Sequence, residues 1–273
     1  MPNLGPGYNF KHMKKIAIIV VTIAMAGMVH AQQMVDGGVD SVVVGSTMPY
    51  AVTPDATIAG MTSVMDPSLF KWYMTDDADN EVTAGFSVAE TPTGGLYAED
   101  SINVTWSAAA GSIFKVKTME GSQPKFGSSC EGSVSELSVE VLEVPTLGLN
   151  GSAPFQSGGC GLSTDTISID VSGIGPWDVT FSVEFDDNGS PVEYTETIGS
   201  TGMNGTFTLD LILDDSNHLT NGAGKYDVNL VNVSDRISSK SLVEVPGNIT
   251  TADEYVIGIY PAPNTGSIRH ISN

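Results

Sequence analysis

The stretch Ile167-Ser-Ile-Asp-Val-Ser-Gly-Ile-Gly-Pro-Trp-Asp-Val-Thr-Phe-Ser-Val-Glu-Phe185 contains two runs in which apolar and polar residues alternate one by one. Successive side chains of a strand point to opposite faces, so each run predicts a β-strand with one buried face. Between the runs, Gly173, Gly175 and Pro176 are residues that favour a turn. The stretch therefore predicts two β-strands joined by a short turn.

The same alternation recurs on both sides of this stretch. Apolar residues share one face in the segments 70–75, 102–106, 114–118, 207–213 and 226–230. Asn204-Gly205 and Asn221-Gly222, dipeptides that accept positive φ, mark turns between strands. After residue 31, no long segment has the 3.6-residue period of an amphipathic helix. Short strands at this spacing predict an all-β chain of antiparallel sandwiches.

Two similar tripeptides indicate how these strands are divided. Glu143-Val144-Pro145 and Glu244-Val245-Pro246 each follow an apolar strand, and their separation is close to the roughly 100 residues of an immunoglobulin-type sandwich. We therefore expect two tandem antiparallel immunoglobulin-like β-sandwich domains, at residues 32–146 and 147–247, and a C-terminal strand and tail at 248–273. A single larger sandwich is the alternative.

The N-terminus has the pattern of a secretory signal peptide. Lys14 and Lys15 precede the apolar run 16–27, and Ala31 ends a Val-His-Ala cleavage site. The run is shorter than the roughly 20 apolar residues that a membrane span needs. We therefore expect residues 1–31 to be a cleaved leader and signal peptide, with no membrane span in the chain. The remainder would be extracellular or at the cell surface, with the periplasm as the alternative.

The exported part is strongly acidic. The whole chain has 11 lysines and arginines and 32 acidic residues, for a formal net charge of −21. Removal of Lys11, Lys14 and Lys15 with the leader leaves 8 bases against 32 acids, a formal charge of −24. Such a charge repels phosphate backbones and anionic membrane surfaces, so it argues against nucleic-acid and membrane partners. Solubility alone is a sufficient reason for this charge.

The two cysteines, Cys130 and Cys160, flank the proposed domain junction. Two cysteines in an oxidising compartment usually pair, so we expect a disulfide between them. In the chain-entropy model, closing a loop of this length stabilises the fold by roughly 3.5 kcal/mol. An intermolecular disulfide and two free thiols are the alternatives.

The sequence contains none of the common catalytic motifs. It has no His-Glu-x-x-His, no Gly-x-Ser-x-Gly and no phosphate-binding loop, and after residue 31 only His218 and His270 remain as histidines. Nucleophilic triads therefore lack a base, and we expect no enzyme and no organic cofactor. Glycoside hydrolysis needs only two carboxylates and stays open as an alternative.

Acidic clusters are candidate calcium sites, because calcium prefers oxygen ligands from loops. The best candidate contains Asp76, Asp77, Asp79 and Glu81. Two further clusters lie at residues 186–188 and 214–217. None has the ligand spacing of an EF-hand loop, and plain solvated turns are the alternative.

Residues 160–181 resemble the Ig-like and PKD-like modules of secreted Bacteroidota surface proteins. In those modules a cysteine precedes a strand, and a Gly-x-Gly-Pro-Trp turn, here ending at Trp177, places the tryptophan in the core. The resemblance implies export through the general secretory route, although the chain lacks the lysine-rich end of the type IX sorting domain. It also implies O-glycosylation where an aspartate precedes Ser or Thr and an aliphatic residue follows. The matching positions are Ser41, Ser101 and Thr166.

These features predict a non-catalytic exported surface protein that works by protein contact. It would be an adhesin component, or a self-assembling subunit of an extracellular filament or sheath, and its partners would be copies of itself or other surface proteins. Residues 254–260 predict a further strand, with Tyr255, Ile257 and Ile259 on one face. This strand can pair with a neighbouring subunit as an assembly strand, or return to its own sandwich.

Two other functions are alternatives. A carbohydrate-binding module would use exposed aromatic residues such as Trp72, Tyr73 or Tyr97 as a sugar-stacking platform. The alternation, however, predicts burial of Trp72 and of the other two tryptophans, Trp106 and Trp177. A periplasmic accessory of a type IX secretion or motility apparatus is the second alternative.

Overall fold

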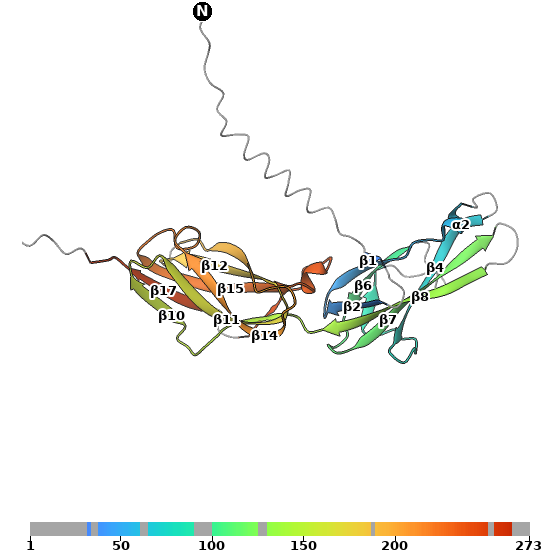
Figure 1. The fold of residues 1–273 in the computed structure, drawn as a ribbon, viewed down its shortest axis with the longest axis horizontal. Coiled ribbons are helices and arrows are strands. Elements are labelled where there is room, and N and C mark those ends of the chain that lie inside the picture. The colour runs from blue at the N-terminus through green and yellow to red at the C-terminus, as the bar shows by residue number, and fades with distance from the viewer. Residues whose placement is uncertain are drawn as a thin grey trace, which may run out of the picture.

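The computed structural model describes residues 32–33, 38–60, 65–89, 100–124, 130–186, 189–250 and 254–263. They form two β-sandwiches placed end to end (Figure 1), which confirms the prediction of tandem immunoglobulin-like domains. Within the described ranges, no helix is long and apolar enough to cross a membrane. The predicted signal peptide at residues 1–31 lies outside the described residues.

The first sandwich consists of two four-stranded sheets, with strand orders β1-β3-β6-β5 and β2-β8-β7-β4. β2 runs parallel to β8 along one edge, and the neighbouring pairs β8–β7 and β7–β4 are antiparallel. The strands are β1 (Gln32–Gln33), β2 (Gly38–Val43), β3 (Thr47–Ala51), β4 (Met65–Asp76), β5 (Phe86–Val88), β6 (Ser101–Trp106), β7 (Ile113–Pro124) and β8 (Cys130–Leu142), and the short helix α2 (Ala56–Ala59) follows β3.

Aromatic side chains fill the core of the first sandwich. Trp106 is fully buried and contacts Tyr50 edge-to-face, with ring centroids 6.3 Å apart. Phe114 lies on the other side of Trp106, at a centroid distance of 5.4 Å. Trp72 is only 6% exposed. The alternation in β4, β6 and β7 thus places the large apolar residues inside, as predicted.

The second sandwich consists of one four-stranded and one five-stranded sheet, with strand orders β14-β11-β9-β16 and β10-β17-β15-β12-β13. β11 and β12 are the two strands predicted from residues 167–185. The strands are β9 (Thr146–Leu149), β10 (Gln156–Cys160), β11 (Thr164–Ile174), β12 (Trp177–Phe185), β13 (Val192–Ile198), β14 (Asn204–Asp214), β15 (Gly224–Asp235), β16 (Asn248–Ile249) and β17 (Glu254–Tyr260).

The C-terminal strand lies inside the second sandwich. β17 pairs in parallel with β10 on one side and antiparallel with β15 on the other. Ile257 is fully buried, Ile259 is 5% exposed, and Tyr255 packs against the same core. The prediction of an assembly strand outside the domain was therefore wrong. An apolar strand between two neighbours in its own sheet has no free edge to offer another subunit.

Residues 236–247, which we name the β15–β16 loop, join the second sandwich to the first. The loop contains a short 3₁₀ helix at Ser238–Lys240. Beyond it, the Leu242 N–H donates to the Thr47 carbonyl at 2.8 Å, and the Thr47 N–H donates to Ser241 Oγ at 2.9 Å. These bonds join the two sandwiches through residues that lie nearly 200 positions apart in the sequence.

An apolar cluster closes the same junction. Val43 from β2 is fully buried against Ile237 and Val245 of the β15–β16 loop, and Leu142, Val144 and Ile174 pack around them. Both Glu-Val-Pro tripeptides therefore lie at one junction. The first lies between β8 of the first sandwich and β9 of the second. The second belongs to a loop that leaves the second sandwich before β17 completes it, and for this reason residue 247 is not the end of that domain.

Trp177 anchors the core of the second sandwich. It is fully buried, and its indole N–H donates to the Ser172 carbonyl at 2.9 Å. We predict that Trp177→Ala lowers the free energy of unfolding by about 3–5 kcal/mol, because it leaves a cavity and an unpaired carbonyl. Urea unfolding followed by circular dichroism measures this change. Ile212→Ala, at a position of the same sandwich that is 60% exposed, is the control with little expected effect. An unchanged midpoint for Trp177→Ala would contradict the core role.

Candidate functional site

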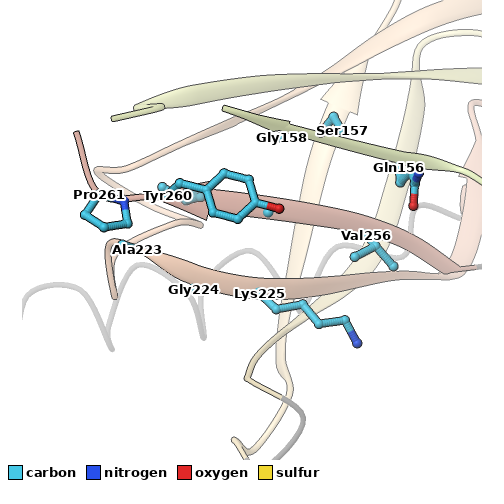
Figure 2. Close-up of a pocket in the computed structure, with 11 residues that line it drawn as sticks. Gln156, Ser157, Gly158, Ala223, Gly224, Lys225, Val256, Tyr260 and Pro261 are labelled. Carbon is cyan, nitrogen blue, oxygen red and sulfur yellow. The ribbon is translucent and has the colours of Figure 1, made fainter. Parts of the chain in front are cut away.

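A groove of about 770 Å³ lies at the end of the second sandwich that faces away from the junction. Its walls come from β10, β17 and the start of β15 (Figure 2), and the chain leaves the groove at Pro261. The three strands are adjacent in the five-stranded sheet. The groove therefore lies on regular backbone, and not on a loop that can change shape.

Missing side chains create this groove. Gly158 of β10, Gly258 of β17 and Lys225 of β15 are in register across the three strands, and two of these three positions have no side chain. A Cβ atom on Gly158 would lie only 2.7 Å from the carbonyl oxygen of Gly258. Glycine at 158 is thus required by the close approach of the two backbones.

Polar and aromatic groups surround the two glycines of the groove. Tyr260 is 59% exposed, and its hydroxyl lies over Gly258, 3.1 Å from where a Cβ atom would be. Lys225 Nζ forms an ion pair with Asp227 Oδ2 at 3.0 Å. An exposed ring beside polar groups can stack against a flat apolar surface and form hydrogen bonds at its rim. It offers no activated nucleophile.

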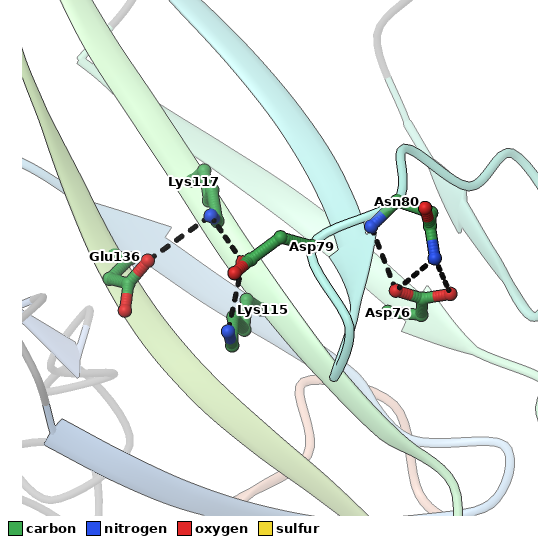
Figure 3. A network of polar contacts seen from close by, with 6 residues as sticks. All are labelled: Asp76, Asp79, Asn80, Lys115, Lys117 and Glu136. Carbon is green, nitrogen blue, oxygen red and sulfur yellow. Dashed lines mark hydrogen bonds and ion pairs between the residues drawn. The ribbon is translucent and has the colours of Figure 1, made fainter.

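Asp76 and Asp79 of the predicted calcium cluster bind different partners (Figure 3). Asp79 Oδ1 accepts hydrogen bonds from Lys115 Nζ and Lys117 Nζ, both at 2.8 Å, and Lys117 also pairs with Glu136 at 3.2 Å. Hydrogen bonds from Lys115 and then Lys117 lower the pKa of Asp79 to about 2. The Asp79 carboxylate is thus paired with two ammonium groups, which offset its negative charge.

Asp76 and Glu81 make contacts of their own within the same loop. Asp76 accepts hydrogen bonds from the backbone and side-chain nitrogens of Asn80, and these bonds lower its pKa. Glu81 forms an isolated bridge with Thr75. In the part of the chain that the structure describes, no three acidic, histidine or cysteine side chains converge as metal ligands. The structure therefore does not bring Asp76, Asp77, Asp79 and Glu81 together as one calcium site.

One of the two remaining acidic clusters is an ordinary turn. Asp214 Oδ1 accepts hydrogen bonds from the N–H groups of Ser216 and Asn217. Together with the Ser216 hydroxyl, these bonds lower the pKa of Asp214. A side chain that closes its own turn has a structural role. Of the cluster at 186–188, residues 187–188 lie outside the described residues.

The predicted disulfide between Cys130 and Cys160 does not form. Both thiols are free and exposed. β8 begins at Cys130 and ends at Leu142 in the junction cluster, so its 13 residues carry Cys130 roughly 40 Å from the junction, at about 3.3 Å per residue. The sequence places Cys130 near the junction, but the length of β8 moves it to the far end of the first sandwich.

Cys160 lies at the opposite far end. It is the last residue of β10 and is paired with Tyr260. The adjacent Ile259 pairs with Gly224, where β15 begins, and β15 reaches the junction only at Asp235. The two thiols are thus at opposite ends of the two-domain unit, and one chain cannot bring them together.

The three predicted glycosylation positions have different accessibilities. Thr166 is exposed on β11, whereas Ser41 on β2 and Ser101 on β6 are half-buried. Ser41 lies on an edge strand. Modification of these positions stays a prediction.

The two predicted sugar-stacking residues that the structure describes, Trp72 and Tyr73, do not form an exposed platform. Trp72 is buried, and Lys71 Nζ lies over the ring of Tyr73 at 5.5 Å from its centroid. Tyr97 lies outside the described residues. Sequence reasoning missed Tyr260, although its position in β17, one residue after the buried Ile259, already indicates the outer face.

No protein-family model matches this chain, and no curated protein matches its sequence. Among solved structures, the I-band fragment I67–I69 of titin matches 84% of this chain and 64% of its own length, with 11% identity and a TM-score of 0.29. Domains FN1–FN3 of chicken CNTN1 match 82% of this chain and 67% of their own length, with 9% identity and a TM-score of 0.28. At these values the likeness adds nothing to the architecture that the strand order establishes.

Replacement of Lys115 and Lys117 tests whether these two lysines bind the Asp79 carboxylate. We predict that the Asp79 carboxylate titrates at a pH of about 2, and that its pKa rises toward the ordinary 3.8 in the double variant Lys115→Met, Lys117→Met. Because folding lowers this pKa, the pairing stabilises the fold above pH 3.8 and is lost as the pH falls through 2. Carbon-detected NMR titration of the carboxyl group measures both values. A wild-type pKa of 3.8 would show that the lysines do not bind Asp79.

Proposed function

We propose that this chain is an exported, non-catalytic surface protein that works by protein contact, as an adhesin component or as a subunit of a filament or sheath. The observation that supports this function is the junction between the two sandwiches. Two hydrogen bonds between Thr47 and the β15–β16 loop, one to the Leu242 N–H and one to Ser241 Oγ, together with a buried apolar cluster, hold the two domains in one arrangement. A stiff two-domain unit keeps its two ends at a fixed separation, which load-bearing and spacer proteins require.

The outer faces of the second sandwich carry polar side chains that are hydrogen-bonded to one another. On the β11–β14 face, Asp170 accepts hydrogen bonds from Asn150 and from Thr208, and Ser168 donates to Asp210. On the opposite sheet, Thr197 donates to Asp178. Faces of paired hydroxyl and carboxylate groups are well solvated and offer little apolar area to a partner. We infer that partners bind at the ends and strand edges.

Export is tested on the native chain. We expect the mature protein to begin at Gln32 and to be released by protease treatment of intact cells, because residues 1–31 would be removed during secretion. Mass spectrometry of the N-terminal peptide and cell fractionation measure both properties. Native electrophoresis of gently extracted protein would show species larger than one chain. A cytoplasmic chain that retains residues 1–31 would contradict the proposal, and an exported monomer would favour the periplasmic accessory role instead.

The groove at Tyr260 favours carbohydrate binding as a second candidate function, because an exposed ring on a flat sheet can stack on a sugar. We predict that Tyr260→Ala weakens retention on an insoluble polysaccharide by about tenfold. Tyr73→Ala, which removes a ring already covered by Lys71, is the matched control and should leave retention unchanged. Affinity electrophoresis measures the retention. Absence of retention in the wild type, or equal loss in both variants, would exclude the groove as a sugar site.

A further inference from the structure

Each of the two exposed thiols stands at the end of an open strand edge. β10, which ends at Cys160, is the outermost strand of its sheet and pairs only with β17. The second thiol, Cys130, is at the start of β8. The edge strand β2 pairs only with residues 137–142 of β8. Among the described residues, positions 130–136 of β8 are therefore paired only with β7. The unpaired N–H and C=O groups of such edges can bind a strand of another chain.

The two open edges can be aligned antiparallel over the five residues of β10. β8 starts with its cysteine, whereas β10 finishes with its cysteine. An antiparallel alignment that places the cysteines opposite each other therefore brings residues 130–134 of one chain alongside residues 160–156 of another. The side chains of residues 130–134 are exposed, so this part of β8 can accept a new neighbour without unfolding.

The residues that face each other in this alignment are compatible. Gly132 faces Gly158 at a bulge of β8, where residues 132 and 133 lie opposite Glu120 alone, and neither glycine has a side chain that would keep the two backbones apart. Glu131 faces Gly159, and no two like charges are opposed. Directly opposite residues of antiparallel strands have Cα atoms about 4.5 Å or about 5.5 Å apart, and both values lie within the range of about 4.4–6.8 Å that a disulfide requires.

We propose that Cys130 of one copy and Cys160 of a second copy form an intermolecular disulfide that locks the antiparallel pairing of these two edges. The partner is thus a second copy of this chain. The inference rests on the proposed function in one respect, because export supplies the oxidising compartment in which the bond persists. It goes beyond that function by naming the contact, its residues and its dependence on redox conditions.

The bond forms by thiol–disulfide exchange with a low-molecular-weight disulfide such as oxidised glutathione. The thiolate of one cysteine attacks a sulfur of this disulfide, forms a mixed disulfide and releases one glutathione thiol. The thiolate of the other chain then attacks the protein sulfur of the mixed disulfide and releases the second glutathione thiol. Two protein thiols are oxidised, and one small disulfide is reduced to two thiols.

Charge explains why a covalent bond is needed. Each exported chain has a formal charge of −24 by sequence, so two copies repel each other. Five paired residues are a short contact, and salt screens the repulsion only in part. The disulfide makes the contact persist, and a reductant reverses it. Because each chain has one edge of each kind, the contact either propagates into a filament or closes when two chains exchange both edges.

The test uses the full chain, purified in reductant and transferred to a buffer of oxidised and reduced glutathione. Cys130→Ser retains only Cys160, and Cys160→Ser retains only Cys130. We expect an equimolar mixture of the two variants to give about tenfold more cross-linked dimer than either variant alone. Non-reducing electrophoresis measures the yield, and peptide mass spectrometry of the linked wild type identifies the Cys130–Cys160 peptide. Hydrogen exchange should slow at residues 130–134 and 156–160 on linkage.

Two results would overturn the proposal. The first is a yield from either single variant that equals the yield from the mixture, since this shows that the thiols react without a preferred partner. The second is formation of the linked peptide without added protection of the two edges, since this shows that the strands do not pair. Neither result depends on export, which the N-terminal peptide and cell fractionation test separately, so the failure of one proposal is distinguishable from the failure of the other.

Discussion

The fixed relation between the two sandwiches depends on one buried carboxylate, that of Asp235 at the end of β15. Asp235 Oδ1 accepts hydrogen bonds from the N–H groups of Ile237 and Ser238, and Oδ2 accepts one from the N–H of Ile174, the last residue of β11. Hydrogen bonds to a charged acceptor are among the stronger ones, and loss of the acceptor leaves buried donors without a partner. Asp235 thus fixes the start of the β15–β16 loop, and the loop places Val245 against the first sandwich.

The position of the Asp235 carboxylate also explains why residue 173 is a glycine. Gly173 has a φ of +117°, and a Cβ atom there would lie 2.6 Å from Asp235 Oδ2. The turn before Trp177 therefore serves two purposes, because it places the indole in the core and makes room for the carboxylate that holds the junction. With the domains fixed in this way, the two thiols and the groove at Tyr260 stay at defined places on the molecule. The contacts that we propose require this arrangement.

Much of the fold follows from alternation alone, because a strand with one buried face needs a period of two. The strands around Trp72, Trp106 and Trp177, the burial of these tryptophans and the division into two sandwiches were predictable for this reason. The junction was not, since it depends on a loop that contacts residues nearly 200 positions away. The place of β17 was misjudged because Val245-Pro246 resembles the end of a domain. The cysteines were misjudged because sequence distance does not reveal in which direction β8 runs.

The β15–β16 loop holds the two sandwiches in a single arrangement. Single-molecule energy transfer between dyes on the native thiols, Cys130 and Cys160, tests it most directly, because the thiols lie at the two far ends of the reduced, monomeric chain. We expect one narrow distribution of transfer efficiency for the wild type, and a broad one for Val245→Asp, which puts a charge into the apolar cluster. An equally broad distribution in the wild type would contradict it.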